Sequence, residues 1–203
     1  RLLAAIAALA GSAATGQNQP PPAATAQSQP AAAKPGAPAF KPEEIEALVG
    51  PIGLYPDALL SQVLMASTYP LEVVQAARWV KANPNVKGDA AVKAVEDQKW
   101  DVSVKSLVAF PQILEPMSEK VDWTQKLGDA FLAQQQDVMA AVQRLRAKAK
   151  DAGNLKSTPE QVVRTEAPPP AASHTAPAPQ INVIESSNPE VVYVPTYNPT
   201  VVY

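Results

Sequence analysis

The chain has 203 residues, of which 22 are proline and none is cysteine, and its formal net charge at pH 7 is −2. The absence of cysteine excludes disulfides, thiolate metal sites, a cysteine nucleophile and a lipid anchor attached through cysteine. The charge lacks the basic excess that nucleic acid phosphates require, so nucleic acid is not an expected partner. The prolines concentrate in two tracts that cannot form a core, so we expect one compact domain.

Residues 1–14 have the pattern of a secretory signal peptide. Arg1 precedes a short apolar run, and small residues follow at positions 11–14. The run is too short for a membrane span, which needs about 20 residues. The alternative, a buried alanine-rich helix, is disfavoured because a polar tract follows at once. We therefore expect an exported protein, and the missing initiator Met indicates that this end is truncated.

Residues 15–40 are almost wholly Gln, Pro, Ala, Ser, Thr and Gly. Such a composition has too little apolar bulk to offset the entropy of ordering the chain, so it predicts a disordered linker. From residue 41 the character changes, and residues 41–155 carry repeated signals for helix starts. We expect this segment to form a compact all-α domain of ordinary size.

The helix starts are marked by proline in the first helical position or by a capping acid. Acidic residues follow several of these prolines in the first helical turn, where they complement the helix dipole. Apolar residues then recur at helical spacing. The predicted starts are Pro42, Pro56, Pro70, Asp89, Asp101 and Pro111, with the last helix broken at Pro116.

The longest predicted helix runs from Asp122 to about residue 152 and ends at Gly153. Trp123 and Phe131 belong to its apolar stripe and are expected to be buried. Four cations fall in its last turns, where they favour the negative end of the helix dipole. They are Arg144, Arg146, Lys148 and Lys150. Their alternate spacing scatters them around the helix, so we interpret them as solvated charges and not as a binding patch.

Residues 156–203 are predicted to contain a proline/alanine linker, residues 167–179, and a β-strand tail. Candidate strands lie at 161–165 and from Ile181. The pattern Asn-Pro-Xaa-Val-Val-Tyr occurs twice near the end, and each copy predicts a turn followed by a short strand. The copies are residues 188–193 and 198–203.

The tail is expected to be an unfinished sheet. A hairpin pairs residues 181–185 with residues 190–194, and a single hairpin is marginal in water. The sheet therefore needs a partner, and the last motif ends with the sequence, which indicates C-terminal truncation. The expected fold is mainly α: a multi-helix domain, a proline-rich linker and a short, incomplete β tail.

Candidate catalytic groups are few. The only histidine, His174, lies in the second linker, where nothing rigid holds it, so we expect no metal, no cofactor and no nucleophile–base pair. A glycosidase needs two carboxylates about 5–10 Å apart. Glu96, Asp97 and Asp101 lie near Trp100, which is able to stack on a sugar ring. The favoured alternative is a helix cap at Asp101 and solvated acids at the other two positions.

The tail offers a second candidate site. Aromatic side chains next to proline and an exposed strand suit a protein interface, because they find little core to enter. The candidate interface residues are Val191, Tyr193, Pro195, Tyr197 and Tyr203.

Several stretches of the chain carry a shared pattern. They include residues 55–60 (Tyr-Pro-Asp-Ala-Leu-Leu), 67–74, 77–79, 99–101, 109–111, 122–125, 127–131 and 188–193. Through them the chain resembles a bacterial envelope family known as domain of unknown function 3300, and the resemblance covers about residue 43 to the last residue. It implies a secreted or periplasmic protein whose tail continues into Tyr/Pro-rich and then Gly-rich apolar sequence. Membrane contact is expected only from that continuation, and the resemblance implies no catalytic residue.

The sequence therefore predicts a non-enzymatic interaction or scaffold module of the cell envelope, whose partner is an envelope protein or a cell-wall component. The competing hypothesis is a periplasmic hydrolase of cell-wall glycan that uses the carboxylates near Trp100. Two close, partly buried acids in a cleft between helices would favour the hydrolase. Acids spread over exposed helix ends would favour the scaffold.

Overall fold

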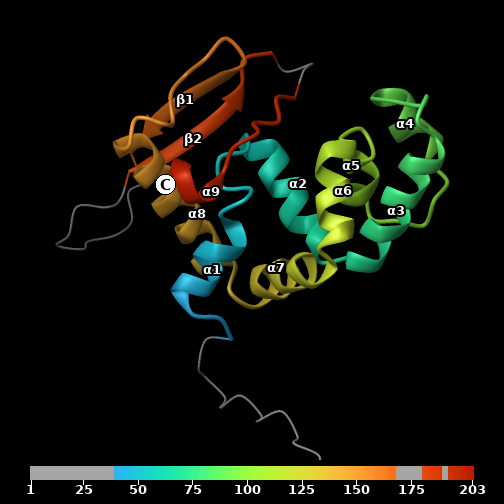
Figure 1. Ribbon diagram of the computed structural model, residues 1–203, viewed down its shortest axis with the longest axis horizontal. Coiled ribbons are helices and arrows are strands. Elements are labelled where there is room, and N and C mark those ends of the chain that lie inside the picture. Colours follow the sequence, from blue (N-terminus) through green and yellow to red (C-terminus); the bar gives the residue numbers. More distant parts are fainter. Residues whose placement is uncertain (1–38, 168–179, 189–191) are drawn as a thin grey trace, which may run out of the picture. The chain divides into compact units, whose positions relative to one another are not determined.

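The computed structural model describes residues 39–167, 180–188 and 192–203. These residues are mainly helical and include one two-stranded antiparallel sheet (Figure 1), which confirms the expected fold class. They belong to one compact unit, Pro35–Tyr203. The predicted signal peptide, nearly all of the first linker and most of the second lie outside the described residues.

The described part of the chain contains nine helices. Their bounds are α1 Pro42–Val49, α2 Asp57–Ser67, α3 Pro70–Ala82, α4 Asp89–Ala94, α5 Val102–Leu107, α6 Pro111–Glu119, α7 Val121–Ala133, α8 Gln135–Asp151 and α9 Pro199–Val202.

The helix starts follow the local signals in the sequence. Pro42, Pro70 and Pro111 each occupy the first turn of a helix, where a missing N–H costs nothing. Asp101 caps α5, because its Oδ1 accepts a hydrogen bond from the Ser103 amide at 2.9 Å. The predicted starts are therefore confirmed to within one residue.

The predicted break of α6 at Pro116 is wrong. The helix continues to Glu119 with Pro116 inside it. One interior proline removes one backbone hydrogen bond. The same helix buries Ile113, Leu114 and Met117 in the core, and this burial outweighs the lost bond.

The single long helix predicted from Asp122 is also wrong, because the chain breaks at Gln134 into α7 and α8. The Gln134 side chain accepts a hydrogen bond from the Phe40 amide at 2.7 Å and donates one to the Phe40 carbonyl at 3.2 Å. This contact spans 94 residues of sequence, and the same side chain also donates to Asp137, three residues further on, at 2.8 Å. Trp123 and Phe131 pack against the core but are only half-buried.

The core is built from the facing sides of α1 to α8. Helix α7 crosses the end of α2 at close range. A Cβ at Gly128 would lie 2.3 Å from the Ser67 carbonyl oxygen, so only glycine permits this approach. The close crossing fixes how α7 lies on α2.

The sheet pairs β1 (Gln161–Glu166) with β2 (Ile181–Ser186), with Val163 opposite Ile184. Both strand segments agree with the prediction, but the pairing does not, because residues 192–194 carry no strand. Of the hairpin turn expected at residues 186–189, all but residue 189 are described, and Ser186 still belongs to β2. β2 pairs with β1 instead, whose β-branched residues suit a pleated surface.

The second Asn-Pro motif forms the short helix α9 where a strand was expected. The Asn198 Oδ1 accepts a hydrogen bond from the Thr200 amide at 3.0 Å, and Pro199 follows as the first helical residue. Asparagine before proline is therefore used here as a helix cap.

The sheet is packed on the helices. Ile184 of β2 has no exposed surface and lies in a cluster with Leu54, Ala149 and Leu155. β2 contacts both α2 and α8. The described part of the tail is thus attached to the helical part by buried apolar contacts, and not only by the linker as the sequence suggested.

Candidate functional site

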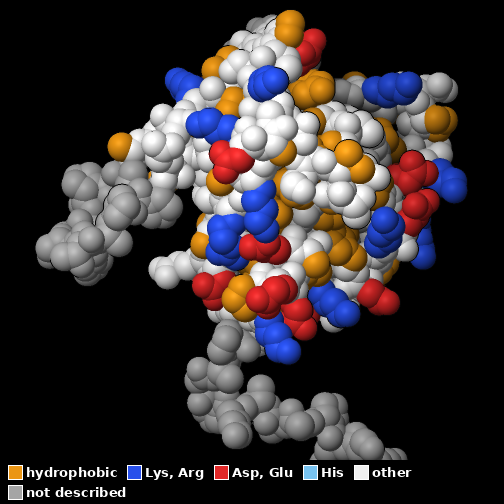
Figure 2. Space-filling model, turned by 60° about the vertical axis from the view of Figure 1, so that its left-hand side comes forward, with side chains coloured by type: hydrophobic (Ala, Val, Ile, Leu, Met, Phe, Trp, Pro, Cys, Tyr) orange, Lys and Arg blue, Asp and Glu red, His pale blue; other side chains and the backbone are white. Residues whose placement is uncertain are grey.

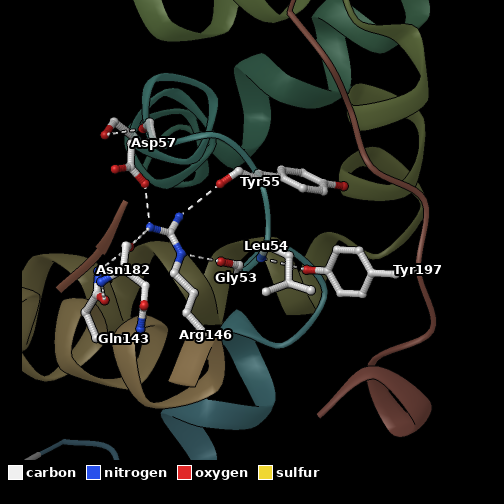
Figure 3. Close-up of polar contacts among 9 residues, drawn as sticks. Gly53, Leu54, Tyr55, Asp57, Gln143, Arg146, Asn182 and Tyr197 are labelled. Carbon is white, nitrogen blue, oxygen red and sulfur yellow. Dashed lines mark hydrogen bonds and ion pairs between the residues drawn. The ribbon is translucent and has the colours of Figure 1, made fainter. Parts of the chain in front are cut away.

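The most constrained polar group in the described residues is the guanidinium of Arg146 on α8. Its side chain is 1% exposed, and it donates hydrogen bonds to three backbone carbonyls. The acceptors are Gly53 at 2.8 Å, Tyr55 at 2.9 Å and Asn182 at 2.8 Å. It also lies 2.5 Å from the carboxylate of Asp57. Figure 3 shows these contacts converging on one side chain.

This arrangement joins three separate parts of the chain. Arg146 belongs to α8, Gly53 and Tyr55 belong to the loop between α1 and α2, and Asn182 belongs to β2. Gln143, one turn earlier, accepts a hydrogen bond from the Asn182 amide at 2.8 Å. A guanidinium presents five donors in a fixed plane, so it satisfies several carbonyls at once. The cluster holds the loop and the sheet in place.

The neighbouring cations have a different role. Arg144 and Lys148 form ion pairs with Glu46 of α1 at 2.6 and 2.8 Å, and both are about half exposed. Hydrogen bonds from Lys148 and Arg144 lower the pKa of Glu46. Figure 2 shows basic and acidic side chains side by side on this face. For these two residues the interpretation as surface charges agrees with the structure, whereas for Arg146 it is wrong.

Two tail tyrosines are anchored on the loop that Arg146 holds. The hydroxyls of Tyr197 and Tyr203 both donate to the Gly50 carbonyl, at 2.9 and 2.8 Å. The Leu54 amide donates to the Tyr197 hydroxyl at 3.2 Å. Tyr197 also makes edge-on ring contacts with Tyr55 and Tyr203, with centroids 6.4 and 6.2 Å apart.

Burial changes the acidity of this tyrosine cluster. It raises the pKa of Tyr197 far above its usual value, and the adjacent Tyr203 adds to the shift. Burial also raises the pKa of Tyr55 and of Tyr203. All three hydroxyls therefore stay protonated at neutral pH and are available as hydrogen-bond donors.

The candidate interface residues of the tail are partly used inside the chain. Tyr197 and Tyr203 are half-buried by the contacts above. Tyr193 and Pro195 are half-buried as well, and the Tyr193 amide lies 3.5 Å from the Ser186 hydroxyl. Val191 lies outside the described residues. The interface role of these residues stays a prediction, and the sequence did not indicate that the chain's own loop receives two of the tyrosines.

The candidate acids do not meet in one site. Asp101 caps α5, and the hydrogen bond from the Ser103 hydroxyl lowers the pKa of its carboxyl group. Glu96 and Asp97 are exposed. Trp100 is half-buried, and its Nε1 donates to Gln75 of α3 at 2.9 Å.

A shallow pocket of about 550 Å³ lies beside these acids, but only Glu96 of them lines it. Asp89, Lys93 and Lys105 also line it, so acids and lysines are balanced there. The geometry agrees with the helix-cap interpretation of Asp101. Within residues 39–167, 180–188 and 192–203, no group of acidic or histidine side chains could hold a metal ion. No helix among the same residues is long and apolar enough to cross a membrane.

The chain belongs to a family of proteins of unknown function. The family model that matches is described as Protein of unknown function (DUF3300), and it covers residues 41–203, which confirms the resemblance found in the sequence. Among curated proteins, the chain is 53% identical over 185 residues to the uncharacterized protein YacH of Escherichia coli (strain K12). The match covers 81% of this chain and 30% of that relative, so the chain spans less than a third of the relative's length. No solved structure matches.

Proposed function

We propose that this chain is an exported, non-enzymatic interaction module of the bacterial cell envelope, which works through its tail and the helical surface that holds the tail. The part of the tail concerned is residues 192–203, which carries Tyr197 and Tyr203. The observation that carries the proposal is the anchoring of Tyr197 and Tyr203 on the Gly50 carbonyl. The tail is held through backbone groups of a loop, as peptide ligands often are.

The chemistry of this contact suits recognition between chains. Tyrosine supplies a large contact area at low conformational cost, and its hydroxyl gives direction. Residues 192–198 have no regular secondary structure, so their contacts do not depend on a sheet. Val192 and Val201 remain 37% and 73% exposed, which leaves apolar surface on the tail. The expected partner is an envelope protein or a cell-wall component.

A glycan hydrolase has less support. It requires two carboxylates placed on either side of a sugar, one of them kept protonated. The hydrogen bond from Ser103 keeps the Asp101 carboxyl ionised, and Glu96 and Asp97 are exposed. These positions favour structural and solvated roles for the three acids.

Export rests on the N-terminal sequence, where a basic residue, an apolar run and small residues follow one another. N-terminal sequencing of the protein from a periplasmic fraction should show cleavage after Ala10 or Ala14. Recovery of the uncleaved protein from the cytoplasm would contradict the proposal.

Binding of the tail in trans is the direct test. A labelled peptide of residues 192–203 is titrated into the full chain carrying Tyr197→Ala and Tyr203→Ala, which frees the loop. Saturable binding is expected, and it should be weaker to the unchanged chain, whose own tail competes. A peptide with Tyr197 and Tyr203 changed to phenylalanine is the control, because it keeps Tyr193 but lacks the two hydroxyls that bond to Gly50. No binding, or equal binding of both peptides, would refute recognition through the hydroxyls.

A second experiment addresses the partner in the cell. A photo-crosslinking residue is placed at Val201 of the tail or at Leu132 of α7, which are exposed to a similar degree, 73% and 71%. Crosslinks to one envelope component are expected from Val201 only. Equal crosslinking from both positions would mean that the tail is not the interaction surface.

A further inference from the structure

An apolar pocket lies between the loop after α1 and the helices α2, α6 and α7, and neither the family nor the tail contact gives it a role. Its volume is about 170 Å³. The residues that line it include Tyr55, Gln112, Ile113, Met117, Lys120 and Trp123.

The walls of this pocket are held by contacts with the rest of the chain. The Trp123 Nε1 donates to the Leu48 carbonyl at 3.0 Å, which fixes the indole ring. Ile113 and Met117 are buried on the inner face of α6. Tyr55 is restrained by its edge-on contact with Tyr197, and Figure 3 shows its ring directed away from Arg146. A preformed cavity with aromatic walls is a common form of small-ligand site.

Three lining side chains carry unused polar groups. None of the hydrogen bonds or ion pairs among the described residues involves the Tyr55 hydroxyl or the side chains of Gln112 and Lys120. Gln112 and Lys120 are exposed at the rim, and Tyr55 is half-buried. Burial raises the pKa of Tyr55, so its hydroxyl remains a donor at neutral pH. The pocket thus combines apolar walls with two donors and one cation.

We propose that this pocket binds a small carboxylic acid with one apolar ring, the ring lying between Trp123 and Met117 and the carboxylate meeting Tyr55 and Lys120. A cavity of about 150 Å³ accommodates benzene, whereas sites for drug-sized ligands and cofactors occupy about 300–1,000 Å³. The volume therefore fits one ring. The rim cation selects an anionic group.

The test uses the full chain labelled with ¹⁵N and follows the indole N–H resonances of its three tryptophans. The Trp123 resonance is assigned by its loss in Trp123→Phe. Benzoate should shift this resonance in a saturable way and leave those of Trp79 and Trp100 in place. Absence of a shift at millimolar benzoate, or an equal shift of all three resonances, would overturn the proposal.

Other probes separate the possible ligands. Toluene has the ring without the carboxylate and should bind more weakly than benzoate, by up to about fivefold for the loss of one exposed ion pair. N-acetyl-phenylalaninamide represents a side chain of a partner peptide. If it binds more tightly than benzoate, the site is an anchor for a peptide and the assigned ligand class is wrong. Equal binding of toluene and benzoate would also overturn the assignment.

Three variants locate the binding site without disturbing the core. Tyr55→Phe removes a hydroxyl that has no partner, and Lys120→Ala removes an exposed cation, so the protein should stay folded. Each variant should weaken the binding of benzoate about fivefold and leave the binding of toluene unchanged. Gln112→Phe narrows the mouth and should abolish binding of both probes. Gln125→Phe is the control for Gln112→Phe, because Gln125 is an exposed residue of α7 outside the pocket. If Gln125→Phe also abolishes binding of the probes, the binding site is not this pocket.

Discussion

Arg146 and Arg144 provide a sharp test of how this fold is held together, because they are two residues apart on α8. Arg146 is 1% exposed and donates to three backbone carbonyls, whereas the Arg144 side chain is 44% exposed and pairs with Glu46. We predict that Arg146→Met is strongly destabilising and that Arg144→Met is nearly neutral.

The magnitude follows from what each change leaves behind. Arg146→Met keeps a chain of similar length but leaves the carbonyls of Gly53, Tyr55 and Asn182 without their donor. Breaking such a buried, charged contact costs about 3–5 kcal/mol. Arg144→Met removes one exposed ion pair, worth about 0–1 kcal/mol, and Lys148 still pairs with Glu46. The whole free energy of unfolding of a domain is about 5–15 kcal/mol.

Urea unfolding followed by circular dichroism measures the difference. For a slope near 2 kcal/mol per molar urea, Arg146→Met should lower the midpoint by roughly 2 M, and Arg144→Met by less than about 0.5 M. Amide exchange in β2 should also accelerate in Arg146→Met, because Asn182 loses its anchor. Similar midpoints for the two variants would refute the argument that the guanidinium joins the loop and the sheet.

Three further predictions concern packing and pH. Gly128→Ala should lower the free energy of unfolding by about 1–3 kcal/mol or more in a urea melt, because its Cβ would lie 2.3 Å from the Ser67 carbonyl oxygen. Ile184→Ala should cost about 2–5 kcal/mol in a thermal melt, because its side chain is fully buried. Because the pKa of Tyr197 is raised in the folded protein, its protonated hydroxyl contributes fully to the free energy of unfolding below about pH 10, and this contribution is lost as the pH rises further. Urea unfolding at pH 7 and at pH 11 measures the loss.

Each of these predictions has a matched control. Lys126→Ala changes an exposed residue of α7 and should leave the free energy of unfolding nearly unchanged. If Gly128→Ala has an equally small effect, α7 can move away from α2. Val162→Ala lies on the partner strand at 37% exposure and should cost much less than Ile184→Ala. Tyr197→Phe should lose less stability than the unchanged chain between pH 7 and pH 11. An equal loss would show that this hydroxyl does not titrate with unfolding.

Much of the helical architecture could be predicted from the sequence, because it depends on local chemistry. Pro42, Pro70 and Pro111 mark helix starts through the missing proline N–H, and Asp101 marks another through its side-chain cap. The β-branched residues of 161–166 likewise indicate a strand without reference to the rest of the chain.

Tertiary structure decided the features that depend on distant partners. The side chain of Gln134, where the long helix breaks, bonds to Phe40, which is 94 residues away. Arg144 and Arg146 are alike as residues, and only the carbonyls brought together by the loop and β2 make one of them buried. A tyrosine side chain suits either a protein interface or the edge of a core. Tyr197 lies at the edge of this core, because its hydroxyl donates to the Gly50 carbonyl. The sequence determines which groups need partners, and the fold determines where those partners lie.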